Sequence, residues 1–430
     1  MSSANPQGLQ AFPEELASRE SWLEPFDWYR EMRDKNPVRY DAERESWDVF
    51  RYEDVKRILD DDATFSVNPR LADDFVEPDN PGEGLIFDTM LFQDPPRHDE
   101  LRGVVDDRFQ PRTLREREPH FRELASDLLD DALGEGSERA ESDEGTESGE
   151  MEVVDDLAYP FPVTVIAELL GVPTEERDRF KRWSDTLVAS ASDDEGDAEY
   201  AERQQQAQME MAQYFIEMIA DRRENPREDL LSRIATAELS DGSKLSQEEA
   251  LGMCILLLVA GNITTTNLIA NAMRCLTAHP EAMARLQAGE VGLEQGVEEV
   301  LRYRSPVQAL ARIATEPVEL RGHEIEAGDA VVPWLGSANR DPSTFEAPET
   351  FRVDRAPNPH FGFGRGTHYC LGAPLARLET RIALDALFER TGDIRRVDEA
   401  LQPVRSAFIY GVEAFPIEFR SQDDVESPAS

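Results

Sequence analysis

The segment that most constrains the fold lies near the C-terminus, where glycines alternate with other residues just before a cysteine. It reads His360-Phe-Gly-Phe-Gly-Arg-Gly-Thr-His-Tyr-Cys-Leu-Gly-Ala-Pro. Glycine at every second position lets the backbone bend sharply and approach something flat and bulky. After Cys370, apolar residues recur three and four positions apart and predict a helix over residues 371–390. The free N–H groups and positive dipole at such a helix start stabilise a thiolate and tune a metal bound to it.

The cysteine itself has two interpretations. A lone cysteine after a flexible loop is usually a buried, inert residue. Here, however, Phe363 can cover the sulfur from water, and His368 can reach a carboxylate beside the loop. Because these residues and the glycines occur together at fixed spacings, we expect Cys370 to be a metal ligand.

The charge of the chain limits its partners. Its 430 residues include 45 basic and 89 acidic residues, a formal net charge of −44. Nucleic acid and anionic membranes would be repelled. The acids are spread along the whole chain rather than gathered in an interaction tail, and lysine occurs only at positions 35, 56, 181 and 244. This favours a halophilic, archaeal source, because the Debye length falls to about 3 Å at 1 M salt and repulsion is screened.

Cysteines and hydropathy indicate the compartment. Cys254, Cys275 and Cys370 are too few and too scattered for a disulfide framework. Residues 1–20 lack the basic start and apolar stretch of a signal peptide. The most apolar run, residues 254–260, is broken by Gly261 and falls short of a membrane span. We therefore expect a soluble, cytoplasmic protein without a membrane partner.

Periodicity predicts a mainly α chain. Helical spacing dominates from about residue 98 to residue 304, and the helices do not alternate with strands as in a doubly wound fold. Short alternating or apolar runs predict strands at residues 38–40, 47–50, 318–320, 324–325, 330–333 and 408–419. Residues 134–150 are almost wholly Gly, Ser, Glu and Asp, which predicts an acidic surface loop.

The cysteine loop closely resembles the haem-binding loop of the cytochrome P-450 family, Phe-Gly-x-Gly-x-His-x-Cys-x-Gly. The matching residues are Phe363, Gly364, Gly366, His368, Cys370 and Gly372. The resemblance extends over residues 25–419 and implies haem b with Cys370 as its axial ligand. It also implies one domain over residues 21–420, between flexible termini at 1–20 and 421–430. The implied fold is triangular, with an α-rich lobe, a smaller β-rich lobe and the haem between them.

A second motif fits the same family. Glu299 and Arg302 match its Glu-x-x-Arg signature. Alone, an acid and a base three apart on a helix are usually a surface pair of small value. In the family this pair is buried, braces the core on the haem side and has an arginine as third partner. Thr350 stands at the usual place of that arginine, with Arg352 nearby.

Four basic residues are expected at the haem propionates. His98 and Arg102 lie four apart, on one face of a predicted helix, although alone they would suit a solvent-exposed helix. The resemblance implies that these two, together with Arg312 and His368, neutralise the two carboxylates. Phe363, Gly364 and Gly372 complete the expected cofactor contacts.

The long apolar helix predicted over residues 246–278 carries the expected oxygen site. A plain core helix would not explain Gly261 and three successive threonines in its middle. Thr264 can bond the carbonyl of Ala260 and open the helix locally. The resemblance implies that Gly261, Asn262 and Thr264 form the oxygen-binding groove, with Thr264 helping to deliver protons. Ile263 stands where the family usually has an acid.

The implied reaction is the insertion of one atom of O2 into an apolar small molecule, with electrons from a separate protein such as a ferredoxin. Candidate substrate contacts are Phe87, Met90, Leu256, Val259, Ala260, Leu310 and Ile409. Candidate residues of a basic docking patch near Cys370 are Arg108, Arg112, Arg365 and Arg377. A monomer is expected.

Two rival functions remain open at this point. A peroxide-driven peroxygenase is conceivable because Ile263 replaces the acid, but residues 262–265 lack the Arg-Pro pair typical of family peroxygenases. A haem-based gas sensor or carrier is the rival that is not an enzyme. The sequence shows no recognisable output domain for signalling.

Overall fold

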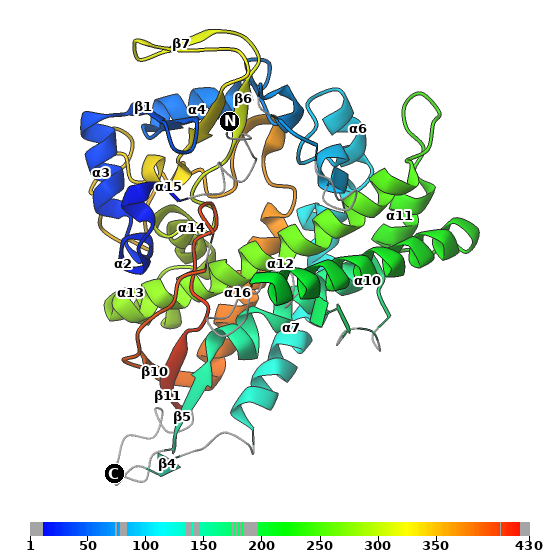
Figure 1. Ribbon diagram of the computed structural model, residues 1–430. Coiled ribbons are helices and arrows are strands. Elements are labelled where there is room, and N and C mark those ends of the chain that lie inside the picture. The colour runs from blue at the N-terminus through cyan, green and yellow to red at the C-terminus, as the bar shows by residue number, and fades with distance from the viewer. Residues whose placement is uncertain are drawn as a thin grey trace.

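The computed structural model describes residues 12–73, 75–77, 84–134, 140–141, 147–173, 176, 179–180, 182–183, 197–404 and 406–421. Within these ranges the chain is mainly helical, with small sheets (Figure 1). The α-helices are α2 (Arg19–Leu23), α3 (Phe26–Lys35), α4 (Tyr52–Asp60), α6 (Arg97–Gly103), α7 (Pro111–Leu133), α8 (Pro160–Leu170), α10 (Asp197–Glu224), α11 (Leu230–Thr236), α12 (Gln247–Ala278), α13 (Pro280–Gln287), α14 (Leu293–Tyr303), α15 (Leu335–Ala338) and α16 (Ala373–Arg390). Short 3-10 and π turns include η3 (Leu85–Asp88), η4 (Asp106–Phe109), η5 (Val154–Ala158) and η7 (Gly366–His368).

The smaller lobe is built on a five-stranded sheet in the order β1-β2-β9-β6-β3. Its strands are β1 (Val38–Asp41), β2 (Ser46–Val49), β9 (Ala330–Pro333), β6 (Arg312–Ala314) and β3 (Phe65–Ser66). β2 and β9 run parallel, with Ser46 opposite Ala330, and the other pairs are antiparallel. β7 (Val318–Leu320) and β8 (His323–Ile325) form a separate hairpin. The mainly α fold with a smaller β-rich lobe is as predicted.

A second sheet lies at the other end of the molecule (Figure 1), in the order β10-β11-β5-β4. Its strands are β10 (Thr391–Arg396), β11 (Pro416–Ser421), β5 (Glu147–Glu152) and β4 (Ala140–Glu141). The prediction of a loop throughout residues 134–150 is therefore wrong at 140–141 and 147–150; residues 135–139 and 142–146 lie outside the described residues. Backbone pairing with β11 makes β5 a strand despite its polar composition, and buried Met151 lies opposite Ile417.

Both ends of the domain differ slightly from expectation. Residues 14–16 form a 3-10 turn with Leu16 buried, and Ser18 caps α2, so the part of 1–20 that the structure describes is ordered. Of the predicted strand over 408–419, only its end belongs to β11, while Ile409 and Val412 make isolated bridges. Residues 1–11 and 422–430 lie outside the described residues.

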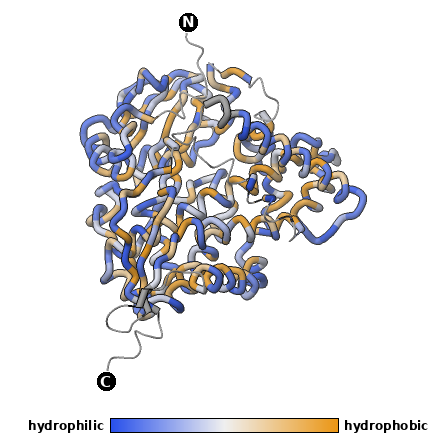
Figure 2. The backbone as a smooth tube through the Cα atoms, turned by 60° about the horizontal axis from the view of Figure 1, so that its bottom comes forward, coloured by the Kyte–Doolittle hydropathy of each residue, from blue (hydrophilic) through white to orange (hydrophobic). Residues whose placement is uncertain are grey.

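The long helix α12 crosses the middle of the molecule (Figure 1). Ser246 and Glu249 form a capping box at its start, which is why the helix begins where the sequence predicts. α12 packs against α8, α10 and α16, and hydrophobic stretches run through the inside of the body (Figure 2). Contrary to expectation, α12 is long and apolar enough to cross a membrane, but 67% of its most apolar window is buried inside the protein. Such burial is typical of the core helix of a soluble protein.

Candidate functional site

Cys370 lies between the η7 turn and α16. α16 begins at Ala373, two residues later than predicted, because Leu371 and Gly372 form a turn in which the Ala373 N–H donates to the Cys370 carbonyl at 3.4 Å. Burial raises the pKa of the Cys370 thiol, while N–H groups of Gly372 and Ala373 and the charges of Arg102 and Arg377 oppose this. The N–H groups of Gly372 and Ala373 thus favour the thiolate, but burial outweighs them and the thiol pKa stays raised.

The glycines of the loop are required by its path. Gly364 and Gly366 have φ of +67° and +70°, values that residues with a side chain rarely adopt. At Gly366 a Cβ atom would lie 2.4 Å from the carbonyl oxygen of Leu59, so the loop presses against the end of α4. The Cys370 N–H donates to the Phe363 carbonyl at 3.0 Å and closes the loop.

Cys370 keeps exposed surface although protein surrounds it. No group of three or more His, Cys, Asp or Glu able to hold a metal ion occurs in the part of the chain that the structure describes. A lone thiolate would suit haem iron, because the porphyrin itself brings the other nitrogen ligands of the metal.

The four predicted propionate ligands come together beside this loop. The rings of His98 and His368 lie 4.4 Å apart, and the Arg102 Nη1 donates to the Tyr369 carbonyl at 2.8 Å. Burial lowers the pKa of His368 to about 3, helped by the positive charges of His98, Arg312 and Arg102. The four basic groups are therefore close enough for their positive charges to repel one another.

Two of these groups lack adequate partners. The His368 Nε2 is buried with no hydrogen-bond partner among the described residues. Arg312 is 7% exposed and, within the described part of the chain, donates only to the carbonyl of Ala311. Burial lowers its pKa to about 10, opposed by Asp94. A buried guanidinium with one backbone acceptor and a buried imidazole nitrogen with no partner are both unfavourable, so the site fits a group that brings two carboxylates, as haem does.

Glu299 and Arg302 form the predicted pair, and both side chains are fully buried. The Arg302 Nε and Nη2 donate to the two carboxylate oxygens at 2.8 and 2.7 Å. The third partner is Arg355, whose Nε lies 3.2 and 3.0 Å from the same oxygens. The Thr350 carbonyl accepts hydrogen bonds from both Arg302 and Arg355. The backbone N–H of Arg352 donates to the Glu299 carboxylate at 2.8 Å. The loop curls around Glu299, so the arginine arrives later in the chain than the family's spacing suggests.

One face of α12 keeps solvent-accessible surface in the middle of the helix. The Thr264 Oγ1 donates to the Ala260 carbonyl at 2.9 Å, as expected, and both residues keep exposed surface within an otherwise buried helix. Asn262 is fully buried, and its Oδ1 accepts from Thr266 at 3.2 Å. Residues two apart on a helix point about 200° from each other. The prediction that Asn262 assists Thr264 is therefore not supported, because its side chain lies on another face.

Gly261 is half-buried and lies beside α8. A Cβ atom there would touch Ile166 of α8 at 3.5 Å, an ordinary contact. Cys370 and the paired histidines thus lie at one loop, and the exposed surface at Thr264 lies on α12, which packs against the helix after that loop.

Comparison with known proteins decides the family. The sequence model of the cytochrome P-450 family matches residues 17–289 and 293–390. The chain belongs to the cytochrome P-450 family. It is 39% identical over 408 residues to cytochrome P-450 109 of Bacillus spizizenii, covering 94% of both chains. It is 38% identical to erythromycin C-12 hydroxylase of Saccharopolyspora erythraea, covering 91% of this chain and 93% of that one.

Solved structures agree with this. Substrate-free CYP109E1 of Bacillus megaterium is 40% identical, covers 93% of this chain and 99% of its own, and superposes with a TM-score of 0.83. The same enzyme in complex with testosterone gives a TM-score of 0.80 with the same identity and coverage. The chain is therefore an oxidoreductase of the cytochrome P-450 monooxygenase class, as predicted.

The predicted substrate contacts of this P-450 differ in burial. Leu256 and Met90 are buried, Phe87, Val259, Leu310 and Ile409 are half-buried, and Ala260 is exposed. η3, which carries Phe87, packs closely on α12, because Gly252 leaves room for the Leu85 carbonyl. Leu310 lies about 4.0 Å from a Cβ position at Gly364 and so borders the cysteine loop. Five of the seven candidates thus keep accessible surface, as residues that line a hollow do.

Sequence analysis missed Glu379 on α16. It is 2% exposed, and burial raises its pKa well above the usual range, opposed by a hydrogen bond with Thr265 of α12. Its spacing in the sequence indicates the burial, because Glu379 lies four residues after Leu375 and three before Ile382, on the apolar face of the helix.

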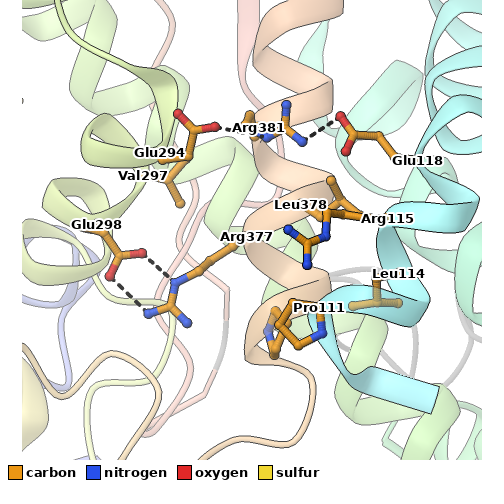
Figure 3. Close-up of a pocket in the computed structure, with 11 residues that line it drawn as sticks. Pro111, Leu114, Arg115, Glu118, Glu294, Val297, Glu298, Arg377, Leu378 and Arg381 are labelled. Carbon is orange, nitrogen blue, oxygen red and sulfur yellow. Dashed lines mark hydrogen bonds and ion pairs between the residues drawn. The ribbon is translucent and has the colours of Figure 1, made fainter. Parts of the chain in front are cut away.

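A pocket of about 210 Å³ opens between α7, α14 and α16 (Figure 3). Arg377 binds Glu298 through two contacts of 2.5 and 3.0 Å, and its guanidinium lies 4.5 Å from the Phe363 ring centroid. Burial raises the pKa of Glu298, but hydrogen bonds from His360 and Arg377 outweigh this and lower it to about 2. Arg377 therefore lies between the pocket and Phe363 of the cysteine loop.

The predicted basic patch is only partly free. Arg377 pairs with Glu298, and Arg365 pairs with Asp60 at 2.7 Å, so two of its four charges are neutralised. Arg112 is exposed, and so is Arg115, which lines the pocket and which sequence analysis missed. Neither forms an ion pair with any residue that the structure describes.

Proposed function

We propose that this P-450 inserts one oxygen atom from O2 into an apolar small organic substrate, with electrons from a separate acidic protein such as a ferredoxin. The observation that carries this proposal is a lone thiol beside a buried histidine nitrogen without a partner and a buried arginine, in a chain whose long helix α12 keeps exposed surface at Thr264. Haem b supplies the activation of O2 when it is bound, with thiolate donation favouring O–O cleavage.

Separate residues of the chain would hold the iron, bind the propionates and orient the oxygen. Cys370 would hold the iron, and the N–H groups of Gly372 and Ala373 would moderate the charge on its sulfur. His98, Arg102, Arg312 and His368 would hold the two propionates, which gives the unpaired His368 Nε2 an acceptor. Thr264, with its hydroxyl held by the Ala260 carbonyl, would orient the oxygen and a proton at the open face.

Two relatives support an apolar substrate. CYP109E1 binds testosterone in its crystal structure, and a second relative hydroxylates erythromycin. The proposed lining is correspondingly apolar, with Phe87, Leu310 and Ile409 half-buried around the open face of α12. A screen of steroids, macrolides and fatty acids that follows the shift of the haem absorption band tests this proposal. The absence of a shift with every apolar compound would contradict it.

An acidic electron donor fits the proximal surface. On a chain of net charge −44, Arg112 and Arg115 form an exposed positive spot close to the cysteine loop. Arg112→Glu/Arg115→Glu should slow reduction by a ferredoxin and leave carbon monoxide binding unchanged. Arg227→Glu is the matched control. Arg227 is 60% exposed, and it lies in the connection between α10 and α11 rather than on α7. Equal reduction rates for both variants, at the lowest salt that keeps the protein folded, would refute this docking site.

The thiolate assignment has a direct test. The reduced, carbon-monoxide-bound protein should show the thiolate-type absorption band, and Cys370→Ala should lose it. Cys254→Ala, which removes a buried thiol of α12, should keep the band. Survival of the band in Cys370→Ala would overturn the assignment.

Peroxide is the competing oxidant, because Ile263 removes the usual acid and hydrogen peroxide carries its own protons. Turnover with peroxide that exceeds turnover with an electron donor would favour a peroxygenase. Normal haem content without O2 consumption under either condition would favour a sensor or carrier. We also propose a cytoplasmic monomer from a halophilic source, in accordance with the spread of acidic residues.

A further inference from the structure

The pocket between α7, α14 and α16 has no part in the chemistry proposed above, and much of its wall is apolar (Figure 3). Five lining side chains share this character: Pro111, Leu114, Val297, Pro374 and Leu378. The volume of about 210 Å³ is roughly seven times the ~30 Å³ that one water molecule occupies in the liquid. Such a hollow favours the apolar part of a small organic molecule over water.

Charged side chains form the rest of the wall, and two of its three arginines are neutralised there. Arg377 binds both carboxylate oxygens of Glu298. Arg381 lies 2.7 Å from Glu118 and 3.5 Å from Glu294. The three acids that line the pocket are therefore already engaged.

Arg115 is the third arginine of the pocket, and it lacks such a partner. It forms no ion pair with any residue that the structure describes, although acids outnumber bases 89 to 45 along the chain. Glu118 follows one helical turn later on α7, but its carboxylate lies against Arg381 instead. In Figure 3 the Arg115 side chain extends from α7 toward α16. A guanidinium without an acid therefore lies at an apolar hollow.

We propose that this pocket is a binding site for a small organic carboxylate, such as an aromatic or short-chain acid. The planar guanidinium of Arg115 donates two parallel hydrogen bonds to the carboxylate, a geometry that suits arginine better than lysine. The apolar body of the ligand lies against Leu114 and Leu378. Because Arg377 and Arg381 have their own acids, the single negative charge of the ligand is matched by Arg115.

Occupancy of the pocket regulates electron delivery. Arg115 belongs to the exposed positive spot that we propose as the docking site for an acidic electron donor. A bound carboxylate cancels one of the two charges of this spot, so the ligand slows reduction of the protein. This consequence rests on the proposed electron donor, whereas binding of the carboxylate does not.

Calorimetric titration of the haem-loaded protein with hexanoate, at one fixed KCl concentration, tests the site. An azole that ligates the haem iron is added first, so that the substrate side is filled. We expect a dissociation constant on the order of 1 mM, as suits a ligand of this size. Acetate, which lacks the apolar body, and hexanamide, which lacks the charge, should each bind at least about tenfold more weakly.

Arg115→Gln is the deciding variant, because it removes the charge from an exposed side chain and leaves the apolar wall intact. It should bind hexanoate at least about tenfold more weakly than the parent and hexanamide with the same affinity as the parent. Arg112→Gln is the matched control, since Arg112 is exposed on the same helix but does not line the pocket. This control should bind hexanoate with the affinity of the parent.

Equal affinities of the parent for hexanoate and hexanamide would overturn the proposal, as would an unchanged affinity for hexanoate in Arg115→Gln. Equal losses in Arg115→Gln and Arg112→Gln would overturn it as well, because they would indicate diffuse attraction to a positive surface. The titration needs neither O2 nor electrons, so failure of the monooxygenase proposal leaves its result unaffected.

The regulatory consequence has its own measurement. Saturating hexanoate should slow reduction of the parent by a ferredoxin about threefold or more and should have no further effect in Arg115→Gln. Unchanged reduction of the parent at saturating hexanoate would refute this consequence.

Discussion

Replacing Arg355 by alanine is the sharpest test of the buried ion cluster on the haem side of the core. Arg355 is 8% exposed, and its Nε lies 3.2 and 3.0 Å from the two carboxylate oxygens of Glu299. Its other nitrogens donate to the carbonyls of Glu346 and Thr350 at 2.7 and 2.9 Å. The substitution therefore removes one cation from a fully buried carboxylate and frees several buried acceptors.

The expected cost follows from that geometry. Removing one partner of a buried ion pair costs about 3–5 kcal/mol, because the remaining charge stays buried without compensation. Glu299 retains Arg302, which donates at 2.8 and 2.7 Å, and the backbone N–H of Arg352. We therefore expect the lower end, about 3 kcal/mol. Arg355→Lys should recover part of this loss, since lysine restores the charge but lacks the planar fork.

Arg352→Ala is the matched control. Its side chain is 42% exposed and lies 3.7 Å from Asp354, and only its backbone N–H reaches Glu299. Its loss should cost less than about 1 kcal/mol. Free energies of unfolding from denaturant titrations, at one salt concentration and with haem content recorded, provide the comparison. If Arg355→Ala and Arg352→Ala unfold with the same free energy, Arg355 is not the third member of the cluster.

Three further predictions concern the loop, acid and salt. Gly366→Ala should prevent normal haem incorporation, because the new Cβ would lie 2.4 Å from the Leu59 carbonyl oxygen at a residue with φ of +70°. Gly103→Ala is the control and should incorporate haem normally, because no atom lies within 4 Å of a Cβ at that position. Equal haem content in the two variants would contradict this prediction. Glu298, whose pKa falls to about 2 in the folded protein, should contribute stability above pH ~4.5 that is lost as the pH falls towards 2. The loss should be on the order of 1–2 kcal/mol after allowance for solvent screening, and Glu298→Gln should flatten this part of the pH–stability curve. The melting temperature should rise with KCl up to molar concentrations, since screening relieves the repulsion of 89 acidic residues, and a fall would refute the halophilic origin.

The parts of the site that sequence analysis predicted correctly are those in which local backbone chemistry determines the geometry. The cysteine loop needs Gly364 and Gly366 because of their positive φ values, so the pattern itself reports the turn. The start of α12 follows from the capping box of Ser246 and Glu249. In each case the residues that cause the structure are neighbours in the chain.

The incorrect predictions concern contacts between distant segments. β5 is a strand because β11 supplies backbone partners, and no property of residues 147–150 alone indicates this. Thr350 lies at the expected place of the third ion-cluster partner, but the loop carries Arg355 to Glu299 instead. Spacing along the chain does not determine how a loop curls around a buried charge.

Glu379 shows how an acid can be overlooked in a sequence although its position is informative. Acidic residues are almost never fully buried unless they are paired, so a glutamate on a helix is assumed to face solvent. Yet Glu379 shares the apolar face of Leu375 and Ile382, where a neutral carboxyl is favoured over a charged one. Its partner, Thr265, is far away in the chain and becomes visible only when α12 and α16 are packed together.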